Sequence, residues 1–316
     1  MLERLAGNAA LKADLGRALA ANRLSHSLLL VGEPGCGAGF AARCLAADYL
    51  YPQGGPHAEA VLRGEDTECL TLRGEGASGQ IPVAKIRTAR EAIQRSALSA
   101  DARGRVLFLY GAQNLNGASA NALLKILEEP PEGVLFLLTA VSAATVLATI
   151  RSRCALYTVA PVARAAAAAV LQNAAPAAPL PDLPSPAAPL PDLPSPAELA
   201  FLYEGHIGSG LRIQRDTGAR ARLADARRLC GFAERGETFL ALGLLSGYEK
   251  EREGVPELLR QAACLASGAL RQPGYAGLSA ARAACVITAA DEALRVFRAN
   301  GNLKLLLTAF GGSITR

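Results

Sequence analysis

The sequence predicts an α/β module built on a parallel sheet, followed by a small helical lid and an all-helical C-terminal domain. In the first half of the chain, short apolar runs alternate with segments that have helical periodicity. A glycine-rich stretch follows the first apolar run, and the strand pattern stops after about Ala160. Such alternation is typical of a parallel sheet covered by helices on both faces.

Five apolar runs are too short to be helices and predict the strands of this sheet. They are Ser27–Val31, Glu68–Leu72, Arg105–Tyr110, Val134–Thr139 and Ala155–Val159. Helical periodicity lies between them in residues 83–97 and 120–127, and Pro130 ends the second of these helices. A further helix, through Leu50, follows the glycine-rich stretch. Because ligands of such sheets bind at the carboxyl ends of the strands, we expect a site there.

Residues 198–316 are predicted to be helical, with a short segment to about Ile213 and then a bundle that ends with Arg295–Leu307. Before them, residues 177–186 are repeated letter for letter as residues 187–196, and proline recurs in both copies. Proline interrupts helices and sheets, so an extended insert is expected. A neutral duplication and a docking segment for a proline-reading domain are both open interpretations. The predicted domains are residues 1–160, residues 161–213 with the insert at 176–196, and residues 214–316.

The composition favours a helix-rich protein of the cytoplasm. Of the 316 residues, 51% are hydrophobic but only 5% are aromatic, and tryptophan is absent. No apolar stretch approaches the length of a membrane span, and the seven scattered cysteines are typical of reduced thiols. The net charge of +5 is too small to argue for nucleic acid. The arginine-rich segment Arg212–Arg235 is interpreted as a solvated helix face or, alternatively, as a surface that follows phosphates.

The glycine-rich stretch, residues 32–39, reads Gly-Glu-Pro-Gly-Cys-Gly-Ala-Gly and matches a phosphate-binding loop in its backbone only. That pattern needs two glycines, then a lysine for the phosphates and a hydroxyl for Mg²⁺. Gly32, Gly35 and Gly37 are present. Ala38 takes the lysine position and Gly39 the hydroxyl position. Residual nucleotide binding through the loop backbone is expected to be weak, and hydrolysis is not expected.

Three further motifs carry a resemblance to a known family. They are Asn-Ala-Leu-Leu-Lys-Ile-Leu-Glu-Glu-Pro-Pro from Asn121, Arg-Ser-Arg-Cys from Arg151, and Asn-Gly-Asn-Leu-Lys-Leu-Leu-Leu from Asn300. Over nearly the whole chain, apart from the insert, the sequence resembles the AAA+ clamp-loader subunits of bacterial DNA polymerase III. Within that family it looks like the delta-prime members, which keep the fold and lose the ATPase chemistry. The resemblance implies an AAA+ module with five parallel strands, a lid and a C-terminal collar.

The resemblance also indicates which ATPase groups are missing. Tyr110 and Gly111 stand where an active member has the acidic pair that holds Mg²⁺. Ala140 stands where a polar residue senses the γ-phosphate, and Gly208 where the lid has an arginine. Phosphoryl transfer depends on such positioned charges. The resemblance therefore implies a non-catalytic subunit of a DNA-directed DNA polymerase holoenzyme, without ATPase activity of its own.

Arg153 is a functional group that the chain retains. With Ser152 and Cys154 on either side, the resemblance implies an arginine finger that reaches the ATP of a neighbouring subunit. A guanidinium is always charged and forks onto phosphate oxygens, which suits that role. From the residues alone, an arginine bound to helix-end carbonyls is an equal alternative. Arg151 is expected to be a solvated neighbour.

No metal and no other cofactor is expected for this chain. Family members carry a four-cysteine zinc module near residues 50–70, where this chain has only His57 and Cys69. One cysteine and one histidine cannot supply the four ligands of tetrahedral zinc. His26 is interpreted as a packing or adenine-side residue. Glu128 and Glu129 belong to the motif and end its helix, and no chemistry is carried over to them.

The resemblance thus implies a clamp-loader ring subunit that does not hydrolyse ATP. The implied partners are the tau/gamma ATPase subunits and the delta subunit in a pentameric ring and, through the complex, the sliding clamp and primed DNA. Two alternatives stay open. One is an active NTPase in which Lys125 replaces the loop lysine, and the other is a stand-alone DNA-binding protein that uses Arg212–Arg235.

Overall fold

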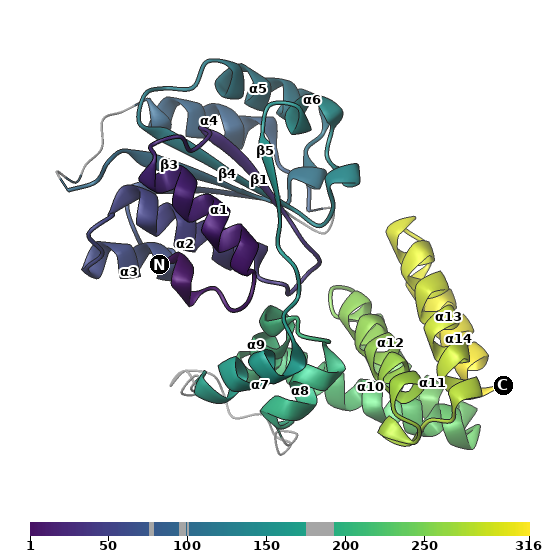
Figure 1. Cartoon of the computed structure of the whole chain (residues 1–316). Coiled ribbons are helices and arrows are strands. Elements are labelled where there is room, and N and C mark those ends of the chain that lie inside the picture. Colours follow the sequence, from purple (N-terminus) through teal and green to yellow (C-terminus); the bar gives the residue numbers. More distant parts are fainter. Residues whose placement is uncertain (76–78, 95–98, 100, 175–192) are drawn as a thin grey trace, which may run out of the picture. The chain divides into compact units, whose positions relative to one another are not determined.

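The computed structural model describes residues 1–75, 79–94, 99, 101–174 and 193–316 (Figure 1). Contacts divide the chain into two compact units. The first consists of residues 1–170 and 205–208, and the second of residues 171–204 and 209–316. This division does not test the three domains predicted from the sequence, whose boundaries stay a prediction.

A five-stranded sheet forms the centre of the first unit. Its strands are β1 (Ser27–Val31), β2 (Cys69–Arg73), β3 (Arg105–Tyr110), β4 (Val134–Ala140) and β5 (Ala155–Thr158). Their order is β2-β3-β4-β1-β5, and every neighbouring pair is parallel. The predicted five-stranded parallel sheet is therefore confirmed, with β2, β4 and β5 differing from the prediction by one residue at one or both ends.

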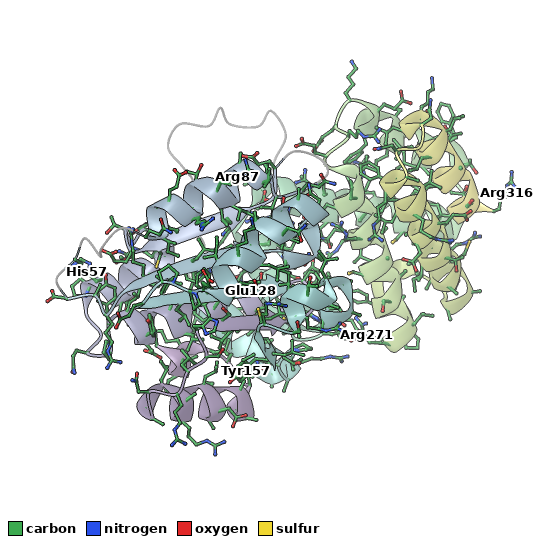
Figure 2. All side chains as sticks on the ribbon, turned by 90° about the horizontal axis from the view of Figure 1, so that it is seen from above. His57, Arg87, Glu128, Tyr157, Arg271 and Arg316 are labelled. Atoms are coloured by element: carbon green, nitrogen blue, oxygen red, sulfur yellow. The ribbon has the colours of Figure 1, made fainter. Side chains whose placement is uncertain are left out.

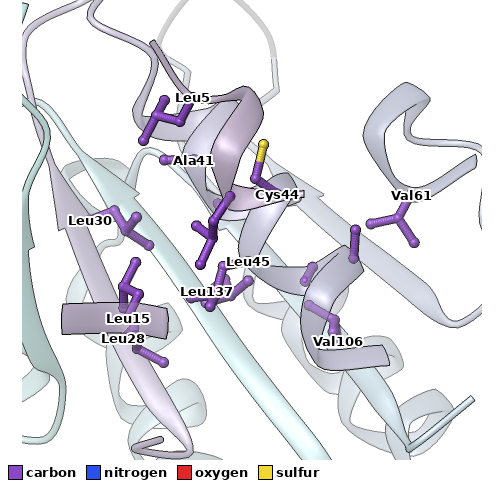
Figure 3. Close-up of a cluster of buried hydrophobic side chains, with 14 of the residues drawn as sticks. Leu5, Leu15, Leu28, Leu30, Ala41, Cys44, Leu45, Val61, Val106 and Leu137 are labelled. Carbon is purple, nitrogen blue, oxygen red and sulfur yellow. The ribbon is translucent and has the colours of Figure 1, made fainter. Parts of the chain in front are cut away.

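Helices cover both faces of the sheet because side chains along β1 point alternately to the two faces (Figure 1). Leu28 and Leu30 pack in one core, drawn in Figure 3, against helices on one side of the sheet. Those helices are α1 (Ala9–Ala20), α2 (Ala38–Leu50) and α3 (Pro56–Arg63). Leu29 and Val31 pack in a second core on the opposite side. The helices there are α4 (Val83–Ile93), α5 (Gly117–Glu128) and α6 (Ala148–Arg151).

The helices that were predicted within this unit are found. α2 runs through Leu50, and α5 contains the predicted helix and ends before Pro130. Asn116 caps α5, since its Oδ1 accepts a hydrogen bond from the Ser119 amide at 2.9 Å. α4 covers the predicted helix as far as Ile93, and Ala97 lies outside the described residues.

The second unit is helical in all of its described elements. Its helices are α8 (Pro196–Leu202), α9 (Ile207–Arg215), α10 (Thr217–Arg235), α11 (Thr238–Ser246), α12 (Val255–Arg271), α13 (Ala280–Arg298) and α14 (Leu303–Thr315), and α7 (Arg164–Asn173) leads into it. Single 3₁₀ turns are η1 (Leu2–Arg4), η2 (Ala112–Asn114), η3 (Ala143–Thr145), η4 (Gly247–Glu249) and η5 (Tyr275–Gly277). None of the described helices combines the length and apolar character needed to cross a membrane.

The predicted helical segment Arg295–Leu307 is wrong as a single element. α13 ends at Arg298 and α14 begins at Leu303. Asn300 has a φ of 56°, a left-handed conformation that asparagine tolerates and that a helix interior excludes. Asn302 then caps α14, because its Oδ1 accepts from the Leu305 amide at 3.1 Å. Asn300 and Asn302 therefore separate α13 from α14, although the apolar periodicity continues across them.

The segment predicted to be extended ends at Ser195, one residue earlier than predicted. Pro196, its last predicted residue, is the first residue of α8, and the Oγ of Ser195 accepts from the Glu198 amide at 3.1 Å. Proline suits the first helical position, since its fixed φ is helical and no amide hydrogen is needed there. Residues 176–192 of the predicted insert lie outside the described residues.

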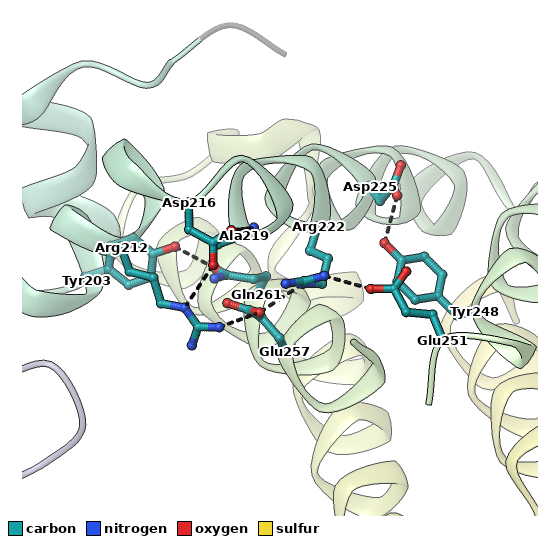
Figure 4. A network of polar contacts seen from close by, with 10 residues as sticks. All are labelled: Tyr203, Arg212, Asp216, Ala219, Arg222, Asp225, Tyr248, Glu251, Glu257 and Gln261. Atoms are coloured by element: carbon teal, nitrogen blue, oxygen red, sulfur yellow. Dashed lines mark hydrogen bonds and ion pairs between the residues drawn. The ribbon is translucent and has the colours of Figure 1, made fainter. Parts of the chain in front are cut away.

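A buried carboxylate joins three helices of the second unit (Figure 4). Glu257 on α12 is 8% exposed, and its Oε2 accepts from Arg212 Nη2 on α9 at 2.9 Å. The same oxygen accepts from Arg222 Nε on α10 at 2.8 Å. Nearby, the Tyr203 hydroxyl lies 2.6 Å from Gln261 Oε1. Charge-assisted contacts that satisfy a buried carboxylate in this way fix how these helices pack.

A second buried ion pair fixes the amino ends of β2 and β3. Glu68 is fully buried, and its Oε2 lies 3.2 Å from Arg105 Nε. Its Oε1 accepts from the Ser99 amide at 2.8 Å, and Arg105 Nη1 donates to the Ala92 carbonyl at 2.6 Å. Both charges are thus paired and hydrogen-bonded within the first unit.

We predict that Arg105→Leu lowers the free energy of unfolding by roughly 3–5 kcal/mol, because it leaves the Glu68 carboxylate buried without its cation. Arg103→Leu is the control, since Arg103 is exposed, and should change stability by less than about 0.5 kcal/mol. Urea denaturation followed by circular dichroism measures both. Equal midpoints for the two variants would contradict a stabilising role of the pair.

Candidate phosphate loop and arginine site

The loop after β1 requires glycine because of its close contacts and its backbone conformation. A Cβ at Gly32 would lie 2.3 Å from Cys36 Sγ and 2.5 Å from the Val159 carbonyl oxygen. Gly35 has a φ of 90° and Gly37 a φ of 102°, both in the region that favours glycine. Gly37 is also the N-cap residue of α2, which begins at Ala38. The three glycines are therefore required by this turn whether or not a phosphate binds.

A segment far along the chain lies against the loop within the first unit. The Gly208 amide donates to the Gly35 carbonyl at 2.8 Å, and a Cβ at Gly208 would lie 3.1 Å from the Gly35 backbone. His206 Nε2 lies 3.0 Å from Glu33 Oε2. Residues 205–208 thus contact the loop through main chain at the place where the lid arginine was expected and is missing.

The ring of Tyr110 covers the position of the missing hydroxyl. Tyr110 is the last residue of β3, and a Cβ at Gly39 would lie only 3.1 Å from its Cε1. The Arg73 guanidinium stacks over the same ring, with its Cζ 4.4 Å from the centroid. Burial raises the pKa of the Tyr110 hydroxyl, against the opposing effect of Arg43 and Arg73. An aromatic ring with a guanidinium over it therefore lies beside Gly39 at the carboxyl end of β3.

At the remaining expected site positions, Gly111 and Ala140, the main chain forms hydrogen bonds at the ends of neighbouring strands. The Gly111 amide donates to the Thr139 carbonyl at 3.1 Å and contacts Thr139 Oγ1 at 3.3 Å. The Ala140 carbonyl accepts from the Gly32 amide at 3.0 Å. The parallel register places Val31 beside Ala140 and Tyr110 beside Thr139, so all of these positions gather at the carboxyl edge of the sheet. The loop therefore lies at the carboxyl edge of the sheet, as predicted.

Arg153 lies at the opposite edge of the sheet. It follows α6 and precedes β5, which runs parallel to β1. The four residues of β5 separate the two edges by roughly 13 Å at a rise of ~3.3 Å per residue. Arg153 is therefore remote from the phosphate loop of its own chain.

The Arg153 guanidinium has three intrachain partners, of which the Ser152 hydroxyl, 3.5 Å from Nη1, is the most distant. Nη2 forms an ion pair with Glu128 Oε1 at the end of α5, the residue labelled in Figure 2. Nη1 donates to the Thr149 carbonyl at 3.1 Å. The side chain still keeps 38% of its surface exposed. Both expected features, a helix-end carbonyl contact and an accessible guanidinium, are present together.

The neighbours of Arg153 fix its backbone. Cys154 packs against the core, and burial raises the pKa of its thiol to about 11. Ser152 Oγ donates to the Thr149 carbonyl at 3.1 Å. Arg151 points elsewhere, with Nη1 donating to the Ala143 carbonyl at 3.1 Å. The structure thus distinguishes the two arginines of the motif by their partners.

Other motif residues lie at the surface of the first unit. Asn121 is exposed on α5, and Glu129 is exposed at its end. His26 lies at the amino end of β1, where its Nε2 contacts the Leu127 carbonyl at 3.2 Å. That place is at the opposite end of β1 from the loop, and His26 is exposed there, so its interpretation as a packing or adenine-side residue stays a prediction.

The region of the expected zinc module holds a hydrogen-bonded cluster. The Tyr51 hydroxyl lies 3.1 Å from Asp66 Oδ2, and His57 Nδ1 lies 3.6 Å from the same oxygen. Burial, with smaller effects of Asp66 and Glu68, raises the pKa of the Cys69 thiol to about 12. Among the described residues, no three histidine, cysteine or acidic side chains are arranged to hold a metal ion. The lack of zinc stays a prediction.

Sequence reasoning missed two contacts that define these sites. The pairing of Arg153 with Glu128 joins residues that no local pattern connects, although both had been singled out by their motifs. Arg73 over Tyr110 was not expected at all, since Arg73 ends a strand that was predicted to begin and end one residue earlier. The signal that could have revealed this contact is the parallel pairing of β2 with β3, which places Arg73 beside Tyr110.

Comparisons with known proteins agree with this geometry. Residues 7–163 match the family model described as DNA polymerase III, delta subunit. DNA polymerase III subunit delta' of Escherichia coli (strain K12) is 32% identical over 149 residues, which cover 45% of this chain and 44% of that protein. DNA polymerase III subunit gamma/tau of Mycobacterium bovis is 37% identical over 150 residues, covering 45% of this chain and 25% of that protein. The matched segments therefore span less than half the length of these curated relatives.

A solved structure shares the fold over the whole chain. It is a DNA polymerase III, gamma subunit-related protein from Thermotoga maritima, with a TM-score of 0.56 and 17% sequence identity. The match covers 96% of this chain and 99% of that one. The sheet order, the glycine-rich loop after β1 and the helical second unit match an AAA+-like fold. By the match of residues 7–163 and the delta' relatives, this part of the chain is similar to the delta and delta-prime subunits of DNA polymerase III.

We predict that Gly205→Ala lowers the free energy of unfolding by about 1–3 kcal/mol. Gly205 has a φ of 83°, and a Cβ there would lie 1.8 Å from the Val162 carbonyl oxygen. Gly16→Ala is the control, because Gly16 is in α1 with no atom within 4 Å of an added Cβ. It should be neutral or stabilising by up to about 1 kcal/mol. Thermal unfolding of both variants tests this, and an equal loss in both would show that residues 205–208 are not held against the first unit.

Proposed function

We propose that this chain is a non-hydrolysing subunit of the DNA polymerase III clamp loader in the cytoplasm. In this proposal it completes a pentameric ring with the tau/gamma ATPase subunits and the delta subunit. Arg153 supplies an arginine finger to the ATP of a neighbouring subunit while the sliding clamp is loaded onto primed DNA. The chain itself uses no zinc and no nucleotide cofactor.

The observation that carries the lack of hydrolysis is the Tyr110 ring against Gly39. The loop offers neither an ammonium nor a hydroxyl, and the end of β3 offers no carboxylate for Mg²⁺. Phosphoryl transfer depends on such charges for positioning and for stabilisation of the transition state. Arginines beside Tyr110 add positive charge where a divalent cation would have to bind.

The role in trans is supported by where Arg153 lies. Its guanidinium is partly exposed at the amino edge of the sheet, whereas the loop is at the carboxyl edge. A phosphate reached by Arg153 would therefore belong to another molecule. The planar fork of arginine matches phosphate oxygens, and this geometry favours Arg153 over Arg151, which is turned toward η3.

The two alternatives have less support. Lys125 is exposed on α5, whose buried face packs in the core on the other side of the sheet from α2. In the segment Arg212–Arg235, six of the seven arginines already contact acidic side chains or carbonyls. These are Arg212, Arg220, Arg222, Arg227, Arg228 and Arg235. Little of this positive charge is left to bind DNA phosphates.

We predict that the purified chain has no ATPase activity and binds nucleotide weakly at most. Ala38→Lys alone should not create turnover, because Gly39, Tyr110 and Gly111 still supply no metal ligand. Phosphate release measured against a mock purification checks the activity, and calorimetry checks the binding. Turnover that disappears when Tyr110 is changed would refute the proposal.

We predict that Arg153→Ala leaves the chain folded and incorporated in the ring but lowers DNA- and clamp-stimulated ATP hydrolysis by the complex. An arginine finger contributes a factor of about 10³–10⁵ at the site it serves, diluted in the total by the other sites of the ring. Arg153→Lys should restore little, because an ammonium lacks the planar fork.

Arg151→Ala is the matched control for this experiment, since it removes the same charge two residues away. It should leave stimulated hydrolysis nearly unchanged. If both alanine variants hydrolyse ATP at the wild-type rate, Arg153 has a structural role at the end of α6 and not a role in trans.

A further inference from the structure

Arg153 is held in one direction by two of the contacts of its guanidinium, beside a longer one of 3.5 Å from Nη1 to the Ser152 hydroxyl. Glu128 pairs with Nη2 from the end of α5, and the Thr149 carbonyl accepts from Nη1 within the turn that precedes Arg153. The two acceptors come from different segments of the chain, so together they fix the plane of the guanidinium. The neighbouring Glu129 forms no ion pair in the part of the chain that the structure describes.

The pair is at the surface, and this determines what it can do. The side chains of Arg153 and Glu128 keep 38% and 47% of their surface exposed. Exposed ion pairs contribute little to folding stability, because solvent screens the charges and both side chains lose rotational freedom. A contact of this kind contributes little to the packing of α5 against α6. It suffices, however, to select one rotamer of a long side chain.

We propose that Glu128 is a positioning residue for Arg153, an inference that rests on the arginine-finger role proposed above. Glu128 holds the guanidinium in one orientation before the neighbouring subunit docks. The γ-phosphate then replaces Glu128 as the partner of the guanidinium. A carboxylate and a γ-phosphate present similar oxygen pairs to the same fork, so one can replace the other. The phosphate carries more charge, and the exposed carboxylate is readily exchanged.

Two effects of removing Glu128 oppose each other. Loss of the competing carboxylate would favour the phosphate, but only slightly, because the exposed pair is weak. Loss of direction lowers the fraction of docked complexes in which the fork is aligned, and catalysis is sensitive to such misplacement. The second effect is the larger, so the variant should be slower.

The test uses the clamp-loader complex assembled with the full chain. Glu128→Ala should lower the stimulated kcat for ATP about twofold to fivefold and leave KM unchanged. Glu128→Gln, which keeps an oxygen acceptor, should lie between Glu128→Ala and the wild type. Glu129→Ala is the matched control and should behave as wild type. Equal rates for Glu128→Ala and Glu129→Ala would overturn the proposal.

A double-mutant cycle separates a positioning role from a structural one. If Glu128 acts through Arg153, Glu128→Ala should have no further effect on kcat in the Arg153→Ala background. Independent, multiplicative losses would overturn the inference while leaving the arginine finger intact. Wild-type hydrolysis in Arg153→Ala would instead refute the finger itself, and the inference with it.

The ion pair can also be checked in the isolated full chain, without any hydrolysis. The side-chain NMR signal of the Arg153 guanidinium, assigned by its loss in Arg153→Lys, should shift in Glu128→Gln and not in Glu129→Gln. An unchanged signal in Glu128→Gln would show that the pair does not form, which contradicts the positioning role and leaves the proposed function untouched.

Discussion

The parallel register of β1 with β4 and β5 is the constraint on which the first unit depends. β1 is buried at every position, and its two neighbours fix where each strand begins and ends. Because all strands run the same way, the residues that follow them collect at one edge and the residues that precede them at the other. The glycine-rich loop and Tyr110 share the first edge. Arg153 and Glu128 share the second, so the loop and Arg153 are separated by the length of a strand.

The fold could be predicted because its determinants are local. β1 and β3 were predicted at their true ends, since a buried parallel strand is an uninterrupted apolar run. The break between α13 and α14 was missed because Asn300 and Asn302 act through a left-handed φ and a cap, while apolar periodicity continues across them. The start of α8 was missed since a proline was taken to exclude a helix, although it is suited to the first position.

The candidate site could be predicted only in part, because its contacts join distant segments. The lost groups at Ala38 and Gly39 are visible in the motif, and the structure adds what replaces them. Neither the ring of Tyr110 over Gly39 nor the pairing of Glu128 with Arg153 has a sequence spacing that signals it. In the second unit, similarly, the segment Arg212–Arg235 is interpreted from its sequence as a basic surface, whereas Glu257 binds Arg212 on α9 and Arg222 on α10.

The glycines of the loop illustrate how a fold can require the residues of a motif independently of its chemistry. A side chain at Gly32 would collide with Cys36 and with the carbonyl of Val159, and both obstacles belong to the fold and not to a ligand. The fold alone therefore requires a glycine at position 32, and its presence is no evidence that a nucleotide binds. The information about nucleotide chemistry is carried by positions 38 and 39, which the motif assigns to the phosphates and to Mg²⁺.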